Sequence, residues 1–154
     1  MKRKAPFYDW NEETGIATCI LYDGDNVFLG MAQCHPDDRD MANEKTGLEI
    51  AEMRAEIKYL THLRDNVFKP QLAALTRFQK DIEQSKLYNP DSYENSMLRR
   101  RIQATKFDLD AVKDELSMAK ENLISYLARI EEFYNHIRSN RKKAENNQEE
   151  TNIS

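Results

Sequence analysis

Apolar residues recur every three or four positions along the second half of the chain. From about Tyr93 to Arg141 no Gly or Pro interrupts this spacing, and charged residues fill most of the positions between. Such a heptad pattern predicts one long helix whose apolar stripe packs against another long helix, either earlier in the chain or in another copy of it. The predicted seam consists of Leu98, Ile102, Leu109, Val112, Leu116, Leu123, Tyr126, Ile130, Phe133 and Ile137.

A second helical pattern precedes this one. It begins at residues 46–49, Thr-Gly-Leu-Glu, which have the form of a capping box, and it keeps mostly to three- and four-residue steps down to about Ser85. Pro70 interrupts it, so we expect a kink near residues 66–69 or two helices end to end. Asn89, followed by a proline, suits the start of the second helix. The chain is therefore predicted to fold back as a long antiparallel helical hairpin.

The pattern near the N-terminus is that of strands. Two apolar segments, 16–22 and 27–34, flank the sequence Asp-Gly-Asp-Asn, which predicts a β-hairpin. Residues 7–10 supply a third, edge strand, because two strands alone would be marginally stable.

A register with Tyr22 opposite Val27 gives the predicted sheet two apolar faces, and both need cover. Thr18, Ile20, Leu29 and Met31 lie on one face. The other face carries several small residues, which would let a helix approach closely. That face consists of Ala17, Cys19, Leu21, Phe28, Gly30 and Ala32.

The expected fold class is mainly α with a small antiparallel β head. A β-hairpin of two or three strands precedes a long antiparallel helical hairpin or coiled coil. We expect residues 1–41 to form the head and a connector, and residues 42–143 to form the helical hairpin. Residues 144–154 are rich in Asn and Glu and lack an apolar period, which predicts a disordered tail.

Charge is distributed unevenly along the chain. Residues 1–41 carry four Lys/Arg and eight Asp/Glu, a net charge of −4, whereas residues 42–154 carry nineteen of each. Neither balance is that of a strongly basic nucleic-acid-binding module. No segment has the apolar run of a signal peptide or a membrane span, so we expect a soluble protein of the cytoplasm. Cys19 and Cys34 are too few for a disulfide framework and are expected to be thiols.

Candidate catalytic and metal-binding chemistry is sparse. No Ser, Cys or Lys has a recognisable activating neighbourhood, and there is no phosphate loop or dinucleotide fingerprint. Cys34, His35, Asp37, Asp38 and Asp40 are residue types that bind metals, but their spacing matches neither a zinc nor a calcium site. We therefore predict that the chain is not an enzyme and holds no metal or cofactor.

The densest basic cluster, near the start of the second helix, is Arg99, Arg100, Arg101 and Lys106. Three consecutive side chains fan around about 200° of a helix, so at most two can address one ligand. The alternatives are a solvated face paired to nearby acids, a contact with an acidic patch on a protein, and binding of nucleotide phosphates.

Aromatic residues crowd the acidic head. They are Phe7, Tyr8, Trp10, Tyr22 and Phe28. The head has little mass to bury all of them, so either the helices cover them or some of them form a protein-binding face.

Residues 28–38 (FLGMAQCHPDD) and 47–60 (GLEIAEMRAEIKYL) carry a resemblance. Over about residues 7–87 the chain is similar to small, mostly uncharacterised proteins encoded by phages and prophages of Gram-positive bacteria. That resemblance supplies no catalytic signature and transfers no site. It implies a phage accessory protein that acts stoichiometrically in the host cytoplasm, as small phage proteins often do.

With the heptad seam, these features indicate a homo-oligomer that binds and blocks or sequesters a host component, as an inhibitor of host defence. One alternative is a virion assembly or scaffolding factor. Another is a nucleotide-binding sponge that uses the arginine cluster.

Overall fold

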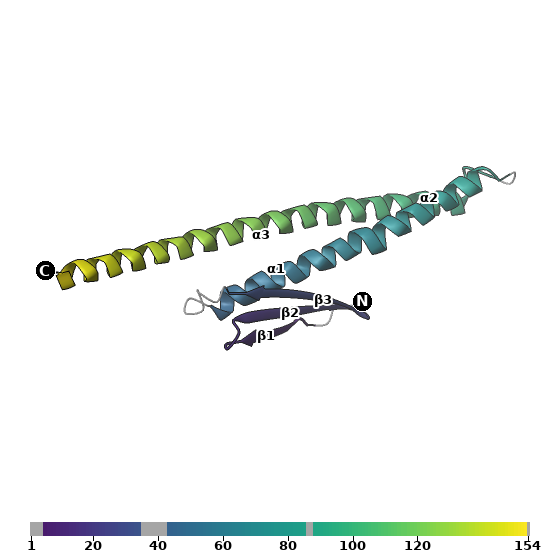
Figure 1. Cartoon of the computed structure of the whole chain (residues 1–154). Coiled ribbons are helices and arrows are strands. Elements are labelled where there is room, and N and C mark those ends of the chain that lie inside the picture. The colour runs from purple at the N-terminus through teal and green to yellow at the C-terminus, as the bar shows by residue number, and fades with distance from the viewer. Residues whose placement is uncertain (1–4, 35–42, 86–87, 154) are drawn as a thin grey trace. The chain divides into compact units, whose positions relative to one another are not determined.

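A three-stranded sheet precedes a series of helices in the computed structural model of this chain (Figure 1), which describes residues 5–34, 43–85 and 88–153. Most of the residues are helical. The chain divides into two compact units, residues 1–119 and residues 120–154. No helix within the described ranges is both long and apolar enough to cross a membrane.

The sheet is antiparallel, with its strands in chain order: β1 (Phe7–Asn11), β2 (Ile16–Asp23) and β3 (Asn26–Gln33). Both the hairpin and the third, edge strand are as predicted from the sequence. Tyr22 pairs with Val27, so the predicted register is confirmed. This register fixes which residues share each face, because successive side chains of a strand point to opposite sides.

Two glycines make the turns of the sheet. Gly24 has φ +59° at the first position of the two-residue turn between β2 and β3, the pattern of a type II′ turn. Gly15 has φ +67° in the loop between β1 and β2, and its N–H donates to the Asn11 carbonyl at 2.8 Å. The Asn11 side chain also accepts from the N–H groups of Glu13 and Thr14.

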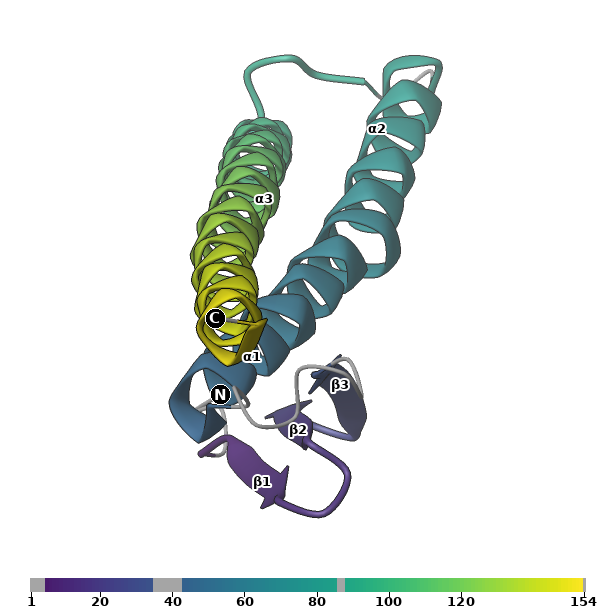
Figure 2. The ribbon, with the colours of Figure 1, turned by 60° about the vertical axis from the view of Figure 1, so that its left-hand side comes forward.

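Helix α1 (Glu44–His62) covers one face of the sheet (Figures 1 and 2). This is the face rich in small residues, so the predicted close approach of a helix is confirmed. The buried apolar residues of this core are Ala17, Cys19, Leu21, Phe28 and Ala32 from the sheet, with Ile50, Ala51, Ala55 and Leu60 from α1.

The first residue of α1 differs from the prediction. Asn43 is the N-cap, and its side chain accepts from the Thr46 N–H at 3.3 Å. The predicted capping box therefore lies inside the first turns of the helix. Gly47 lets the helix pack closely on the sheet, since a Cβ at this position would come within 3.0 Å of the Ala17 Cβ.

A π-helical turn, η2 (Leu63–Phe68), joins α1 to α2 (Lys69–Glu83). The Lys69 N–H donates to the Arg64 carbonyl, five residues earlier. Pro70 lies in the first turn of α2, where its missing N–H costs least. The predicted interruption of the helix before Pro70 is confirmed. It takes the form of a π turn between α1 and α2.

Helix α3 (Tyr93–Ile153) has 61 residues. Its first free amides are capped by Ser92, whose Oγ accepts from the Asn95 N–H at 3.2 Å. The predicted cap, Asn89, instead closes the preceding turn by accepting from the Asp91 N–H at 3.0 Å. The start of the helix therefore lies three residues later than the sequence predicts.

The other end of α3 also differs from the prediction. The helix continues to Ile153, whereas disorder is predicted from residue 144 onwards. No Gly or Pro occurs after Pro90, and Ala, Glu, Gln and Lys are good helix formers. Low hydrophobicity alone therefore does not end this helix.

The apolar stripe of α3 is buried in the first unit. Its buried side chains are at most 8% exposed and follow one another at steps of three and four: Ile102, Thr105, Leu109, Val112 and Leu116. Leu98, earlier in the predicted seam, is half-buried.

In the second unit the seam residues Leu123, Tyr126, Ile130 and Ile137 are half-buried. Phe133 is 60% exposed and is a correction to the predicted seam. Tyr134 is half-buried in its place, because an α-helix drifts away from a strict seven-residue repeat.

Candidate protein-binding face

The aromatic residues of the head divide between the two faces of the sheet. Phe7 pairs with Ile20, Tyr8 with Cys19 and Trp10 with Ala17. Tyr8 and Trp10 therefore lie on the face that α1 covers, together with Phe28. The remaining two aromatics, Phe7 and Tyr22, lie on the opposite face, which we call the open face.

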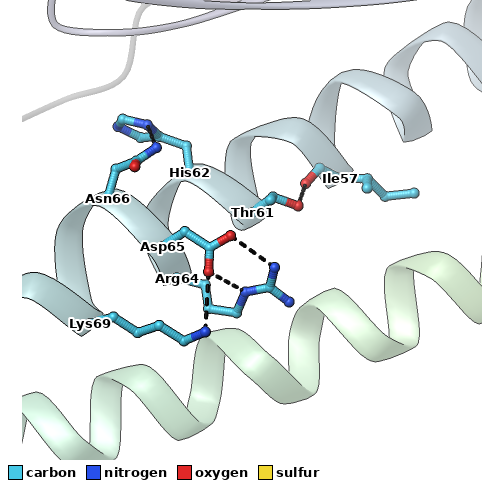
Figure 3. Close-up of polar contacts among 7 residues, drawn as sticks. All are labelled: Ile57, Thr61, His62, Arg64, Asp65, Asn66 and Lys69. Carbon is cyan, nitrogen blue, oxygen red and sulfur yellow. Dashed lines mark hydrogen bonds and ion pairs between the residues drawn. The ribbon is translucent and has the colours of Figure 1, made fainter.

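Phe28 is a core residue and not a residue of a binding surface, which corrects its assignment from the sequence. It is 8% exposed. Its ring centroid lies 5.4 Å from that of Tyr59 in an edge-to-face contact and 5.2 Å from that of His62. The other side of His62 contacts the Asn66 amide at 3.1 Å (Figure 3).

The open face carries an apolar surface that extends across all three strands. One row crosses the sheet from Phe7 through Ile20 to Leu29, and Tyr22 with Val27 forms the next row. Several of these side chains are exposed: Phe7 52%, Val27 58%, Leu29 39% and Met31 46%. Exposed apolar side chains gathered on one sheet face are typical of a binding surface.

The outer edge of β3 is occupied by two cations from α1. Lys58 Nζ donates to the Leu29 carbonyl at 2.6 Å, and Arg54 Nη1 donates to the Met31 carbonyl at 2.7 Å. Because these edge carbonyls already have partners, addition of another strand at this edge is unfavourable. A partner that contacts β3 is therefore expected at the open face and not at this edge.

The charged residues of the sheet itself are all acidic, although Arg54 and Lys58 of α1 bring two cations to the outer edge of β3. Residues 5–34 contain no Lys or Arg, and their acidic residues are Asp9, Glu12, Glu13, Asp23 and Asp25. Asp9 lies on the open face, opposite Thr18, and the others lie in or beside the two turns. These turns are at opposite ends of β2, about 23 Å apart for eight residues. The sheet therefore has acidic groups near both ends of this apolar surface, although Asp23 itself alternates onto the covered face.

The basic residues predicted to bind phosphate do not form one site. Arg99 Nη2 donates to the Pro90 carbonyl at 3.1 Å and stabilises the turn before α3. Arg100, Arg101 and Lys106 are exposed. On one helix these side chains point in different directions, as expected from their spacing.

A groove between α2 and α3 gathers cations that sequence reasoning missed. Its volume is about 500 Å³, and its lining consists of Lys69, Leu72, Ala73, Thr76, Arg77, Lys80 and Leu109. Its three cations come from one face of α2, and its apolar lining residues are Leu72, Ala73 and Leu109. The sequence does contain a signal for this cluster. Lys69, Arg77 and Lys80 are separated by eight and then three residues, and positions with this spacing lie on one face of a helix.

The π turn also carries an ion pair. Arg64 contacts both carboxylate oxygens of Asp65, at 2.8 and 2.9 Å, and Lys69 Nζ lies 3.3 Å from the same carboxylate (Figure 3). The hydrogen bonds from Arg64 are the main cause that lowers the pKa of Asp65 from 3.8 to about 2. Lys69 contributes to the same shift. The hydrogen bond to Asp65 likewise raises the pKa of Arg64.

Within the described ranges, no three His, Cys, Asp or Glu side chains lie close enough together to hold a metal ion. Most of the metal-capable run at residues 34–40 lies outside those ranges. Cys19 is buried, Cys34 is half-buried, and both are thiols, as predicted.

In comparisons with known proteins, no family model, no curated protein and no solved structure matches this chain.

Proposed function

We propose that this chain is a non-catalytic binding protein and that the open face of its sheet receives a protein partner. The observation that carries the proposal is the exposure of Phe7, Val27, Leu29 and Met31 side by side on one face of a sheet. Covering such a face with an apolar surface removes it from water, at roughly 25 cal/mol per Å².

The acidic groups at both ends of the open face determine the chemistry of the partner. A partner surface with apolar residues at its centre and Lys or Arg at its flanks would complement both the apolar surface of the sheet and its acidic groups. Charge complementarity of this kind speeds association and selects the partner.

In the proposed role, the protein acts in the cytoplasm of a bacterial host as a phage accessory protein. It binds one host component stoichiometrically and blocks or sequesters it, as an inhibitor of host defence. The support for this context is the resemblance of residues 7–87 to phage and prophage proteins. An alternative with the same chemistry is a virion assembly or scaffolding factor, whose partner would be a capsid or tail subunit.

The helices have a separate part in the proposal. We propose that α2 and the first part of α3 close as an antiparallel coiled-coil hairpin, and that the rest of the seam supports assembly. Leu109 of α3 lines one groove with Leu72 and Ala73 of α2, which supports closure within one chain. The buried stripe from Ile102 to Leu116 is the surface that such a closure would cover.

The test is retention of host proteins on the immobilised full-length chain. We expect wild-type protein to retain a partner at stoichiometric level, and Val27→Lys with Leu29→Lys to lose it. Phe107→Lys is the matched control, because Phe107 is 74% exposed but lies on α3. Circular dichroism checks that all the variants fold. If the double variant retains the same proteins as wild type, the open face is not the binding surface.

A second candidate function, nucleotide binding, is favoured by the groove between α2 and α3. Arg77 and Lys80, with Lys69 paired to Asp65 beside them and Leu72 and Leu109 in the same lining, suit an anionic ligand with an apolar or aromatic body, such as a nucleotide. A ligand at 100 times its dissociation constant should add about 2.7 kcal/mol of stability. Thermal-shift measurements with a panel of nucleotides test this, with Arg77→Gln and Arg100→Gln separating the groove from the arginine cluster. If no nucleotide in the panel raises the melting temperature, nucleotide binding is excluded.

A further inference from the structure

We infer that the open face binds residues 129–143 of α3 from a second copy of this chain. The inference rests on the proposed function, since the second copy would occupy the same face until a host component displaces it. Both halves of the contact are present in every chain, so a pair of copies could satisfy two such contacts at once.

The segment 129–143 has an apolar ridge of suitable shape. Ile130, Phe133, Tyr134 and Ile137 are spaced at three and four residues, so they lie along one side of the helix. Phe133 is 60% exposed, and the other three are half-buried. A single apolar ridge on a helix matches the flat apolar surface of a sheet face, as α1 already shows on the opposite face of the same sheet.

The charges of the two surfaces are opposite. Residues 129–143 carry five Lys/Arg and two Glu, a net charge of +3, whereas residues 5–34 carry five acids and no Lys or Arg. Arg129 stands at one end of the ridge, and Arg141 and Lys142 stand at the other.

The spacing of these charges also agrees. Twelve residues of helix separate Arg129 from Arg141, which is about 18 Å. The acidic turns at the two ends of β2 are about 23 Å apart. The long arginine and lysine side chains can span the difference. A helix laid along the strands would therefore bring a cation to each acidic end while its ridge covers Ile20 and Leu29.

Two copies that each place their segment 129–143 on the open face of the other form a closed dimer. Each copy offers one open face and one basic segment, so two copies form two identical contacts related by a twofold axis and leave neither surface unused. This predicts a dimer that depends on charge as well as on apolar contact, in contrast to a dimer held by the heptad seam alone.

The test uses two charge-reversed variants of the full-length chain. The head variant carries Asp9→Lys, Glu13→Lys and Asp25→Lys, at positions that are all exposed. The tail variant carries Arg129→Glu, Arg141→Glu and Lys142→Glu, at positions that are also exposed. Light scattering coupled to size exclusion gives the mass of each protein, and circular dichroism checks that it folds. A third protein carries all six changes in one chain.

We expect wild-type protein to run with the mass of two chains. The head and tail variants alone should dissociate, with affinity at least ~10-fold weaker, because each places like charges opposite each other. An equimolar mixture of the two should recover the dimer mass, since both contacts then pair opposite charges. The six-fold variant should recover it by itself.

Three results would overturn the inference. Wild type that stays a monomer at all concentrations excludes the exchange. Dimer mass that the head and tail reversals leave unchanged assigns association to another surface. Recovery of the dimer mass in the six-fold variant but not in the mixture means that the two charged segments pair within one chain and that another surface holds the dimer. None of these removes the proposed function, which fails only if Val27→Lys with Leu29→Lys leaves retention of host proteins intact.

Discussion

Gly30 of β3 lies against the backbone carbonyl of Ala51 in α1 so closely that no side chain fits between them. A Cβ added at Gly30 would overlap the Ala51 oxygen and would also come within 2.5 Å of the Ala55 nitrogen. Both obstacles are helix backbone, which cannot rotate away as a side chain can. The contact therefore sets how near α1 lies to the sheet.

Gly30→Ala should destabilise the protein by about 3 kcal/mol or more, because the helix must move away from the sheet to admit one methyl group. Chemical denaturation monitored by circular dichroism measures this change. Met31→Ala is the matched control, since Met31 is the next residue of β3 and is 46% exposed on the open face. It should change the free energy of unfolding by less than about 1 kcal/mol. Equal effects of the two substitutions would mean that the two faces are not distinct.

Neighbouring residues of β3 should also differ in the cost of truncation. Phe28→Ala removes a ring that is packed against Tyr59 and His62, and we expect a loss of about 3 kcal/mol in unfolding free energy. Measured at concentrations where the protein is a monomer, Leu29→Ala should cost less than about 1 kcal/mol, because Leu29 is 39% exposed on the open face of a single chain. The same denaturation experiment compares them. A larger loss at Leu29 would show that the open face is covered in the folded protein.

A charge in the buried stripe of α3 should disrupt its packing. Leu116 is 2% exposed, and Leu116→Asp buries a carboxylate among apolar side chains, at a cost of about 3 kcal/mol or more. Met118→Asp is the control, because Met118 is 62% exposed two residues along the same helix. Unfolding curves and light scattering are measured together. A fall in mass for Leu116→Asp alone shows that the stripe joins chains, whereas a fall in stability at constant mass shows that it closes within one chain.

The ion pair in the π turn should make stability depend on pH in the acid range. The pKa of Asp65 is lowered from 3.8 to about 2, so the ionised carboxylate stabilises the folded state above the unfolded pKa. That contribution is lost as the pH falls through the folded value. The melting temperatures of wild type and Asp65→Asn should therefore differ by a constant amount above about pH 4 and converge towards pH 2.

Arg64→Gln provides the matched background for this measurement. It removes the main cause of the pKa shift, so Asp65→Asn should then have a smaller effect at neutral pH, and the two curves should converge at higher pH. If the difference between wild type and the Asp65→Asn variant stays the same throughout the acid range, the assignment is contradicted.

Much of the sheet follows from sequence because local signals agree there. The alternation of apolar residues and the turn at Gly24 fix the register of β2 with β3, and the small residues around Gly30 predict the close helix. Which aromatics are exposed could not be predicted in the same way. That depends on the pairing of β1 with β2, which places Phe7 on the open face and Tyr8 on the covered one, and on how far α1 extends over β1, since Tyr8 is still 43% exposed.

The ends of the helices are less well predicted, because several residues compete for the same role. Asn43 and Thr46 can both cap α1, and Asn89 and Ser92 can both cap α3. Only the packing of the first turn decides between them, as Gly47 shows by its contact with the sheet. The groove beside α2 was missed because its residues are an ordinary polar helix face until Leu109 supplies the other wall.

The π turn Leu63–Phe68 gives this chain a rotational offset in the middle of what would otherwise be one rod. Each residue of an α-helix turns by about 100°, and a π turn accommodates roughly one residue more than an α turn. Regular α winding through the same residues would swing every side chain of α2 by about a quarter turn relative to those of α1, whereas deleting one residue would remove the wider turn and keep their directions. The wider turn thus decides in which direction α2 presents its side chains relative to those of α1.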